Sequence, residues 1–457
     1  MKKILLIVLR PSDFIEMNRI KESLSGLFKF KIIYFSPGRD QKIIEDPSLK
    51  NIQEDLDKVL KYRHKKKKKM NKTFFNIFFQ FLKNIFYRNI LKKTIHQLII
   101  IKLYYRNYFL FKKILFKNID LLILAEDIVG PIHPVAIKAA RKNNISTLVF
   151  PYTIANQMEA FQSLKLNTAL DCNNHLLNLI CSFFFPRWVL KRDGKKILRL
   201  PPGHILAHFL LNISPPDPWM MNSGKANQII VESKKMYKYY VEAGIPESKL
   251  TIGGALYDDI LYNFKKNING SKMKLKKKLN IKKNKKILLV NGCPDQSKNC
   301  PLFPFNDMTD FLFNLKKKLF ILKNHFEIVI RPHPNYKEFG DFFLKNSNFV
   351  VTYDDTAHLV AISDILLAFA SATIRWGLSC KIPIINYDVF NYSYDDFIHE
   401  SGVKNINSLE QLESFFLKIK SKTNFYYLKR NCEMNDNWGF MDGKTKKRVI
   451  KQIDKHL

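Results

Sequence analysis

The sequence predicts an α/β protein with two doubly wound, Rossmann-like domains that face each other across a cleft. The chain has 457 residues, which leaves room for more than one domain, and 46% of them are hydrophobic, enough to fill complete cores. Short apolar runs alternate with helical stretches. Because these runs are continuously apolar, they are typical of parallel strands that helices cover on both faces. Two separate series of runs therefore predict two domains.

The first series of predicted strands begins at the start of the chain and continues into the third hundred residues. Its runs lie at 3–9, 30–35, 120–125, 147–151 and 228–232. In the first run only six apolar residues precede Arg10, and no small-residue cleavage site follows. It is therefore expected to be a buried strand rather than a secretion signal. These runs predict an N-terminal domain over 1–245.

The second series predicts a C-terminal domain over 286–423. Its runs lie at 286–290, 326–331, 348–352, 364–369 and 382–387. Between the two series, Gly253-Gly254 and a lysine-rich stretch predict a linker over 246–285. The last residues, 424–457, are expected to form one or two closing helices.

Two aromatic segments interrupt this alternation. Residues 61–118 begin with a lysine run, Lys65 to Lys69, and continue with aromatic residues at helical spacing: Phe74, Phe78, Phe81 and Phe86. The segment is either a basic amphipathic surface that lies on anionic lipid or a helical insertion packed on the sheet. Residues 176–190 form a second apolar patch that is too short to span a bilayer. This patch either touches a membrane or a lipid acceptor, or belongs to the core.

The net charge of +36 has two explanations that the sequence leaves open. One is compositional, because lysine, isoleucine, asparagine and phenylalanine are all abundant. The other is a negatively charged partner such as nucleic acid, anionic lipid or a phosphorylated substrate. Nucleic acid is disfavoured, because the basic residues are spread along the chain and no recognised module occurs. The six cysteines form no C-x-x-C pair and fit a reducing, cytoplasmic compartment.

The segment Arg331-Pro332-His333-Pro334 directly follows a predicted strand. The carboxyl ends of parallel strands face the ligand crevice of an open α/β sheet. Two prolines fix the backbone around the imidazole of His333, which can donate a hydrogen bond or a proton to a phosphate oxygen. The neighbouring Arg331 is predicted to bind the same phosphate. The alternative is a buried histidine whose hydrogen bonds are satisfied at a strand end.

Small and hydroxyl-bearing residues follow two further strands of the second series. Ser371 is expected to cap a helix that runs to about Cys380, and its hydroxyl, that of Thr373 and the free N–H groups of the helix suit a phosphate. The turn at Asn291-Gly292 would let the ligand approach the backbone.

Glu126 and Asp127 follow a strand of the first series. One of these carboxylates could deprotonate an acceptor hydroxyl as a general base. The alternative is a capped turn in which Asp127 starts the next helix. His204 and His208 stand four residues apart without a third ligand, and no Walker A or G-x-G-x-x-G sequence occurs, so neither a metal nor another cofactor is predicted.

These segments resemble the GT-B glycosyltransferase superfamily, and within it the bacterial surface-polysaccharide branch. That branch includes sialyltransferases and polysialyltransferases, Kdo transferases and CDP-glycerol glycerophosphotransferases. The resemblance rests on the His-Pro segment at 331–334, on Ser371 and Thr373, and on the runs at 231–233, 243–246 and 252–258. It covers about 225–415 and extends to the first domain only through its architecture.

The resemblance implies a role for each predicted site residue. His333 would contact and protonate the leaving phosphate, the hydroxyls of Ser371 and Thr373 would bind that phosphate, and the first domain would receive the acceptor. Arg375 and Trp376 stand where such enzymes often carry a ribose-binding carboxylate, which favours a CMP- or CDP-linked donor over a UDP-linked one. A His-Gly pair is expected of glycerophosphotransferases after 147–151. The sequence has Pro151-Tyr152 there, which disfavours that subtype.

The sequence therefore predicts a metal-independent, cytoplasmic glycosyltransferase, peripheral on the inner face of the membrane. It would move a sugar from a nucleotide-sugar donor to a lipid-linked glycan or a surface polysaccharide such as capsule or lipopolysaccharide. The alternatives of the same fold are a CDP-alditol phosphotransferase and a UDP-sugar epimerase-like enzyme. Alternatives of another class are a basic nucleic-acid-binding protein and a membrane scaffold.

Overall fold

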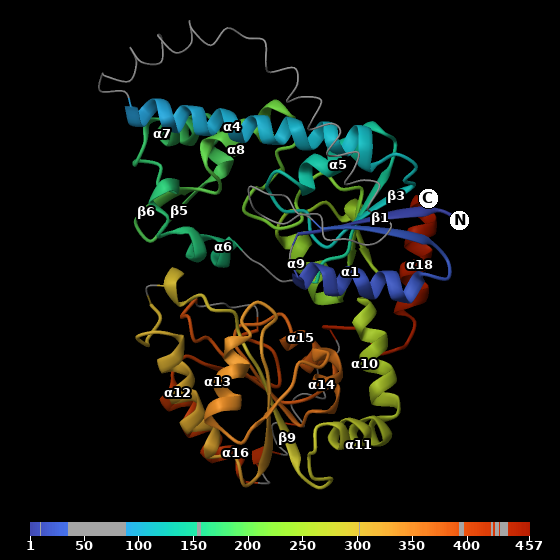
Figure 1. The fold of residues 1–457 in the computed structure, drawn as a ribbon, viewed down its shortest axis with the longest axis vertical. Helices are drawn as coiled ribbons and strands as arrows, with labels where there is room; N and C mark the ends of the chain where they lie inside the picture. The colour runs from blue at the N-terminus through green and yellow to red at the C-terminus, as the bar shows by residue number, and fades with distance from the viewer. Residues whose placement is uncertain are drawn as a thin grey trace, which may run out of the picture. The chain divides into compact units, whose positions relative to one another are not determined.

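The described residues of the computed structural model form two compact units. The structure describes residues 1–9, 11–34, 88–152, 157–300, 302–392, 397–421, 424–425, 429 and 437–457. The N-terminal unit comprises Met1–Pro151, Ala155–Ile229 and Lys455–Leu457, and the C-terminal unit comprises Tyr152–Ile154 and Ile230–Asp454. Figure 1 shows a sheet and its flanking helices in each of them.

The first six-stranded sheet has the order β2-β1-β3-β4-β7-β8. Its strands are β1 (Lys3–Val8), β2 (Lys29–Tyr34), β3 (Leu121–Leu124), β4 (Ser146–Val149), β7 (Gln228–Val231) and β8 (Leu250–Ile252). From β2 through β7 every pairing is parallel. Residues 4–8 of β1 are buried, so the first run of the chain is a core strand, as predicted.

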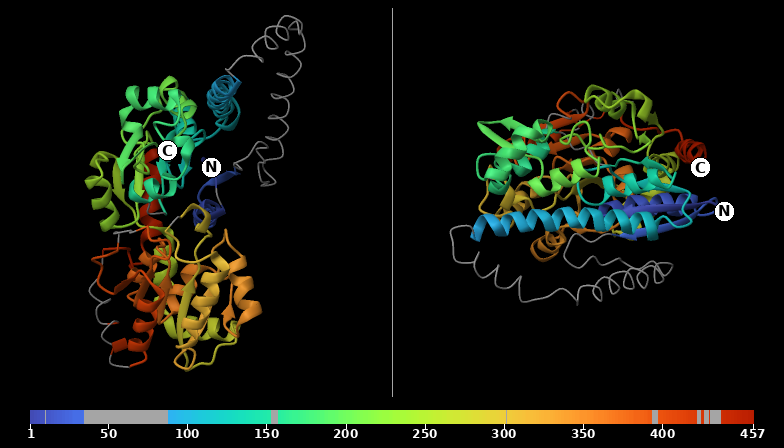
Figure 2. Two further views of the ribbon diagram at one scale, coloured as in Figure 1. Left: turned by 90° about the vertical axis from the view of Figure 1, so that its left-hand side faces the viewer. Right: turned by 90° about the horizontal axis from the view of Figure 1, so that it is seen from above.

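Helices and a small hairpin complete the described part of the N-terminal unit. The helices are α1 (Pro11–Leu24), α4 (Arg88–Leu110), α5 (His133–Lys142), α6 (Gln157–Leu164), α7 (Leu176–Phe184) and α8 (Pro202–Leu210). β5 (Val189–Arg192) and β6 (Lys195–Leu198) pair antiparallel. The long helix α4, seen lengthwise and end-on in Figure 2, packs against α5 and α8.

The second six-stranded sheet has the order β11-β10-β9-β12-β13-β14, and all of its pairings are parallel. The strands are β9 (Lys286–Asn291), β10 (Phe326–Arg331), β11 (Val350–Val351), β12 (Ile365–Ala368), β13 (Ile384–Tyr387) and β14 (Val403–Ile406). The helices are α12 (Met308–Phe320), α13 (Glu338–Asn346), α14 (Thr356–Ile362), α15 (Ile374–Ser379) and α16 (Leu409–Ile419). The chain proceeds outward from β9 to one edge and from β12 to the other, so the sheet is doubly wound. The predicted fold class, α/β with two doubly wound sheets, is confirmed.

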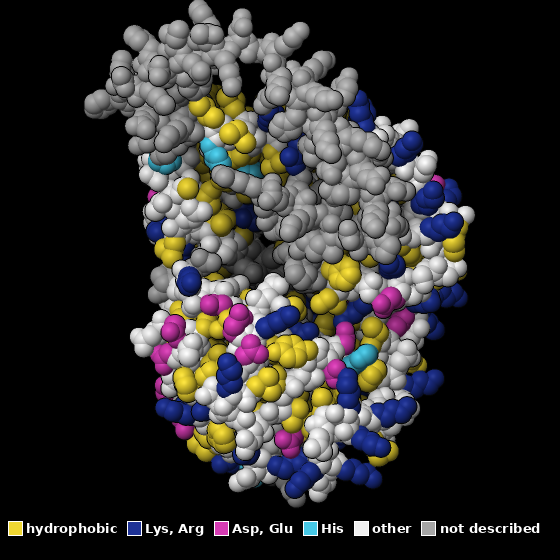
Figure 3. Space-filling model, in the orientation of Figure 1, with side chains coloured by type: hydrophobic (Ala, Val, Ile, Leu, Met, Phe, Trp, Pro, Cys, Tyr) yellow, Lys and Arg dark blue, Asp and Glu magenta, His cyan; other side chains and the backbone are white. Residues whose placement is uncertain are grey.

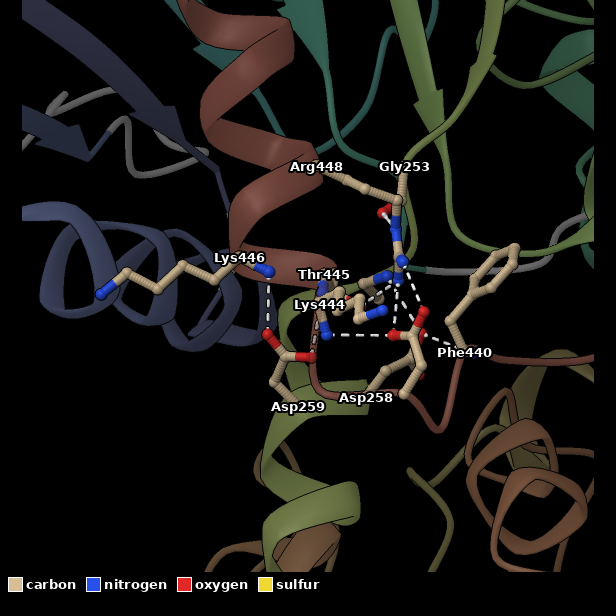
Figure 4. A network of polar contacts seen from close by, with 10 residues as sticks. Gly253, Asp258, Asp259, Phe440, Lys444, Thr445, Lys446 and Arg448 are labelled. Carbon is tan, nitrogen blue, oxygen red and sulfur yellow. Dashed lines mark hydrogen bonds and ion pairs between the residues drawn. The ribbon is translucent and has the colours of Figure 1, made fainter.

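The C-terminal helix α18 (Thr445–His456) is anchored at the start of α10 (Leu256–Lys266), which α11 (Ile268–Lys278) follows. The carboxylate of Asp259 accepts the backbone N–H groups of Thr445 and Lys446 at 3.0 and 2.8 Å. These are unsatisfied donors of the first turn of α18, so Asp259 caps that helix (Figure 4). Gly254 has a φ of +81°, and a side chain there would meet the hydroxyl of Thr445. The run at 252–258, together with Asp259, therefore holds the start of the C-terminal helix α18 in place.

The strands that the sequence did not predict are β5, β6, β8 and β14. β5, β6 and β14 combine apolar residues with lysine or arginine, and β8 is only three residues long, so none of the four has a long continuous apolar run. Within the segment 61–118, residues 61–87 lie outside the described residues, and with them Lys65 to Lys69, Phe74, Phe78, Phe81 and Phe86. Residues 88–115 are helical, forming α4 and a π-helical turn, Phe111–Leu115.

On the face of the C-terminal unit that Figure 3 shows, the positive charge is spread rather than concentrated. In the view of Figure 3, lysine and arginine side chains of the C-terminal unit are scattered among acidic and hydrophobic ones. A search of the described residues finds no helix with the length and hydrophobicity required to cross a membrane.

Candidate active site

Three loops of the C-terminal unit begin side by side at one edge of its sheet. In the register of the strands, Asn291 of β9 lies opposite Arg331 of β10 on one side and Ala368 of β12 on the other. The strand order reverses between β9 and β12, and open α/β sheets bind their ligands beyond the carboxyl ends of the strands at such a reversal. The topology therefore brings three distant segments, 291–292, 331–334 and 370–373, to the place where a ligand is expected.

A chain of hydrogen bonds joins Asn291, Thr373 and Ser371. The side-chain amide of Asn291, which is buried, donates to Oγ1 of Thr373 at 2.8 Å. Oγ of Ser371 lies 3.0 Å from the same Oγ1, and either hydroxyl can be the donor. In both cases one of the two hydroxyl hydrogens has no acceptor among the described residues. The arrangement can thus present an O–H donor to an anion.

The backbone that carries this hydroxyl pair is held in an unusual conformation. Ala370 has a φ of +46°, in the left-handed region, which costs about 1–2 kcal/mol for a residue with a side chain. The buried amide of Asn386 compensates, since its Oδ1 accepts the N–H of Ala370 at 3.0 Å. The turn through 371–373 moves the helix start, so that α15 is capped at Thr373 rather than at Ser371 as expected.

The imidazole of His333 is fixed in one tautomer by its own turn. The N–H of Asn335 donates to Nδ1 at 3.1 Å, so the proton of the neutral ring lies on Nε2. Burial, and secondarily the charge of Arg331, lowers the pKa of His333 from 6.5 to about 4. The ring is therefore neutral at pH 7 and offers an N–H donor without a positive charge.

Arg331 and Gly292 have structural partners at this edge. The guanidinium of Arg331 donates to the carbonyl of Pro332 at 2.6 Å. The N–H of Gly292 donates to the carbonyl of Arg331 at 2.8 Å, and a Cβ on Gly292 would lie 3.1 Å from the ring of Phe339. The ring of Phe339 thus leaves little room for a side chain at position 292, which explains why this residue is glycine. The predicted contacts of Arg331 and Gly292 with phosphate stay predictions.

A buried ion pair supports the loop 370–373, which carries the hydroxyls of Ser371 and Thr373. Arg375 and Glu232 form this pair, and each side chain is only 1% exposed. Nε of Arg375 also donates to the carbonyl of Ala372 at 3.2 Å, and its Nη2 donates to that of Tyr152. Sequence reasoning did not assign these roles to Arg375 and Glu232. The available signal was an acidic residue directly after the apolar run 229–231, a position at which a charge needs a partner.

Glu126 and Asp127 lie in the N-terminal unit, after β3, at the strand-order reversal of the first sheet. Both are buried. Oδ1 of Asn222 accepts the N–H of Asp127 at 2.7 Å, and the N–H of Asn222 donates back to the carbonyl of Asp127. Asp127 does not start a helix, because α5 begins at His133. Asn222, which sequence reasoning missed, orients this acidic turn.

Solved structures resemble the chain at low sequence identity. UDP-GlcNAc 2-epimerase from Neisseria meningitidis, bound to UDP-GlcNAc, has a TM-score of 0.51 and 14% identity, over 99% of this chain and 100% of that one. S. aureus MnaA, in a UDP co-structure, has a TM-score of 0.49 and 14% identity, over 100% of this chain and 97% of that one. The wall teichoic acid polymerase TagF has a TM-score of 0.48 and 13% identity, over 74% of this chain and 73% of that one. The first of these supports the two-domain fold. No curated protein sequence matches the chain.

A family model matches most of the chain. It is described as CDP-glycerol:poly(glycerophosphate) glycerophosphotransferase and spans residues 156–455. The matched region contains Asn291, His333, Ser371 and Thr373 but neither Glu126 nor Asp127. The presence of Pro151-Tyr152 disfavoured this subtype. The match corrects that prediction as far as membership of the family is concerned, because one dipeptide outside the matched region does not decide it, and it leaves the transferred group open. The chain is a transferase with the GT-B fold and belongs to the CDP-glycerol:poly(glycerophosphate) glycerophosphotransferase family.

Proposed function

We propose that the protein transfers a group from a cytidine-nucleotide-activated donor to a hydroxyl group of a cell-surface polymer. The observation that carries this proposal is the hydrogen-bond chain of Asn291, Thr373 and Ser371 at the strand-order reversal, one strand away from the neutral imidazole of His333. The description of the family, which names CDP-glycerol, supports a cytidine donor. Arg375, buried against Glu232, supports it as well, because it replaces the ribose-binding carboxylate associated with other donors.

In this proposal the phosphate of the donor accepts hydrogen bonds from the C-terminal unit. The hydroxyls of Ser371 and Thr373 and the Nε2–H of His333 are the donors. A bound phosphate brings negative charge next to the imidazole, which raises the pKa of His333 above its ligand-free value. The ring can then stabilise, and in the transition state protonate, the departing phosphate oxygen. These donors act on the leaving phosphate without a metal ion.

The acceptor is proposed to be activated in the N-terminal unit. A carboxylate, Glu126 or Asp127, takes the proton of the acceptor hydroxyl while the acceptor oxygen forms its bond to the transferred group. The bond between that group and the donor phosphate breaks at the same centre, and the electron pair leaves with the phosphate. Asn222 would hold the Asp127 backbone in place during this step.

Two transferred groups are compatible with this chemistry. A sugar is our first candidate, because Pro151-Tyr152 stands where a glycerophosphotransferase is expected to carry His-Gly, and Tyr152 accepts a hydrogen bond from Arg375 through its backbone carbonyl. An alditol phosphate is the second candidate and is favoured by the family description. The product is proposed to be part of a capsule or lipopolysaccharide, made in the cytoplasm, where nucleotide-activated donors are available.

A nucleotide panel tests the choice of donor. The melting temperature of the protein is measured with CMP, CDP, UDP, GDP and ADP. A nucleotide present at 100 times its Kd stabilises the folded state by about 2.7 kcal/mol. We expect CMP or CDP to give the largest shift and Thr373→Val to reduce it. Equal shifts by all five nucleotides, or a larger shift with UDP, would contradict the cytidine proposal.

Product analysis then separates the two transferred groups. The protein is incubated with CMP- and CDP-linked sugars or with CDP-glycerol, together with a polysaccharide acceptor, and the phosphorus content of the product is measured. Sugar transfer adds mass without phosphorus, whereas glycerophosphate transfer adds one phosphorus for each group. Release of nucleotide without growth of the acceptor would indicate hydrolysis or epimerisation and argue against transfer.

A further inference from the structure

Helix α7 buries its polar side and exposes its apolar side. Its buried residues include Asn178, Cys181 and Ser182. Its outward residues are the large apolar ones: Leu176, Leu179, Ile180, Phe183 and Phe184, with Phe183 78% exposed. A helix on the surface of a water-soluble domain has the opposite arrangement. The packing of the described residues of the N-terminal unit therefore leaves this inversion unexplained.

Hydrogen bonds hold α7 in this orientation. The side-chain amide of Asn178 donates to the carbonyls of Ala169 and Asp171 at 3.0 and 2.7 Å. Cys181 packs in a small core with Cys172, Trp188, Leu198 and Ile205. Rotation of the helix would break these hydrogen bonds and expose this core. The apolar side therefore faces outward because the structure fixes it there.

The exposed surface continues onto the end of α8. Phe209 and Leu210 are 61% and 53% exposed, α8 packs against α7, and the rings of Phe185 and Phe209 lie 5.5 Å apart. Figure 1 shows the two helices next to each other. We define the α7 face as Leu176, Leu179, Ile180, Phe183, Phe184, Phe209 and Leu210. A contiguous exposed apolar patch of this kind marks an interaction surface.

Basic residues accompany the α7 face. Between Cys172 and Leu210 the chain has six lysine or arginine residues and a single acidic one, Asp193. Four exposed cations lie on the hairpin of β5 and β6, which follows α7 directly: Lys191, Arg192, Lys195 and Lys196. An apolar helix face followed in the chain by a cationic hairpin matches the combination of acyl chains and charged headgroups that an anionic membrane presents. This charge pattern favours lipid over a second copy of the same basic chain.

We propose that the α7 face inserts into the outer part of an anionic lipid leaflet while the hairpin cations contact the headgroups. Nine residues of helix are about 14 Å long, so α7 lies in the plane of the membrane and does not cross it. The surface contains none of the predicted donor-site residues. The inference is independent of the proposed function, and it would place the enzyme where lipid-linked acceptors are found.

Sedimentation with lipid vesicles tests this proposal on the full chain. One set of vesicles is phosphatidylcholine alone, and the other also contains phosphatidylglycerol. We expect sedimentation with the anionic vesicles that weakens as salt is raised. Replacing Phe183 and Phe184 together by glutamate should lower the bound fraction by about tenfold or more, because each side chain would carry charge into the apolar layer. Lys191→Glu with Lys195→Glu should weaken binding and reduce its salt dependence.

The controls keep a negative result interpretable. Leu344→Glu replaces an equally exposed apolar residue of α13, outside the α7 face, and should bind vesicles as the wild type does. The melting temperature shift with nucleotide should survive in every variant, which separates this inference from the proposed donor site. The proposal would be overturned if the wild-type protein does not sediment with anionic vesicles, or if the Phe183/Phe184 variant sediments with them as well as wild type does. A wild-type dimer that the same variant converts to a monomer would also overturn it.

Discussion

The side-chain amide of Asn291 donates a 2.8 Å hydrogen bond to the hydroxyl of Thr373, although the two residues are 82 positions apart in the chain. Asn291 ends β9, and Thr373 lies in the loop after β12, its neighbour in the sheet. The parallel register places the ends of the two strands side by side, and the turn at Ala370 brings Thr373 back to Asn291. The polar edge of the C-terminal sheet is therefore assembled before any ligand arrives, which reduces the ordering that binding requires.

Thr373→Val tests the hydrogen-bond chain with a side chain of nearly the same shape. It removes the acceptor of the buried Asn291 amide and should lower the free energy of unfolding by about 1–3 kcal/mol in urea titrations. Loss of a hydroxyl that contacts a charged phosphate should also weaken nucleotide binding by about 1.5–3 kcal/mol in calorimetry. Thr373→Ser keeps the hydroxyl and should behave nearly as wild type. Unchanged nucleotide affinity in the valine variant would exclude Thr373 as a ligand.

His333→Ala should reduce kcat by about 100-fold or more if the imidazole assists the departing phosphate. His333→Gln is the matched control, because its amide can still donate a hydrogen bond and should preserve nucleotide affinity while kcat remains low. An alanine variant that turns over at a near wild-type rate would remove the role assigned to His333.

The low pKa of His333 gives a separate prediction about pH. Burial holds the pKa at about 4, against 6.5 in the unfolded chain. The folded state therefore favours the neutral ring. This contribution to stability is complete above pH 6.5 and is lost as the pH falls toward 4. Over pH 5–8 the ring stays neutral, so kcat/KM should show no titration from His333 in the free protein. A break in kcat/KM near pH 6.5 that His333→Gln abolishes would contradict this.

Asp258 should make the protein less stable as the pH rises toward neutrality. Burial raises the pKa of this carboxyl to about 7, and its Oδ2 accepts the N–H groups of Ala255 and Phe440 (Figure 4). The folded state binds this proton more tightly than the unfolded chain does. The stabilisation is complete below pH 3.8 and is lost as the pH rises through 7, at about 1.4 kcal/mol per unit of pKa difference.

Asp258→Asn provides the measurement. The amide oxygen can accept both N–H groups without carrying a charge, so the free energy of unfolding should rise at pH 8 and vary less between pH 5 and 8. Urea titrations at several pH values give both quantities. A variant that is less stable than wild type at pH 8, with unchanged pH dependence, would show that Asp258 is charged in the folded protein.

Much of the fold could be predicted because strand signals are local. Every continuous apolar run named in the sequence overlaps a strand of one of the two sheets. The predicted loops 291–292, 331–334 and 370–373 could be placed at one edge because strand ends are local features as well. The pairing of Glu232 with Arg375 and the support of Ala370 by Asn386 could not be predicted, because both depend on side chains that meet only in three dimensions. The inversion of α7 could not be predicted either, since the periodicity of a surface helix predicts a buried apolar side, the opposite of what α7 has.

Replacing Glu232 alone should destabilise the protein more than replacing Glu232 and Arg375 together. Glu232→Gln leaves the buried guanidinium without its counter-charge and should cost about 3–5 kcal/mol of stability. Replacement of both residues by methionine removes both charges and should recover part of that loss. A double-mutant cycle in urea supplies the coupling energy. Additive effects would mean that the pair does not brace the loop.

The claim on which this account depends is that Ser371, Thr373 and His333 share one phosphate. A crystal structure of the protein with bound CDP tests it most directly. We expect a phosphate oxygen at about 2.5–3.2 Å from Oγ of Ser371 or Oγ1 of Thr373, and another at the same range from Nε2 of His333. A nucleotide whose phosphates lie elsewhere, with these three side chains unchanged, would contradict the assignment of the active site.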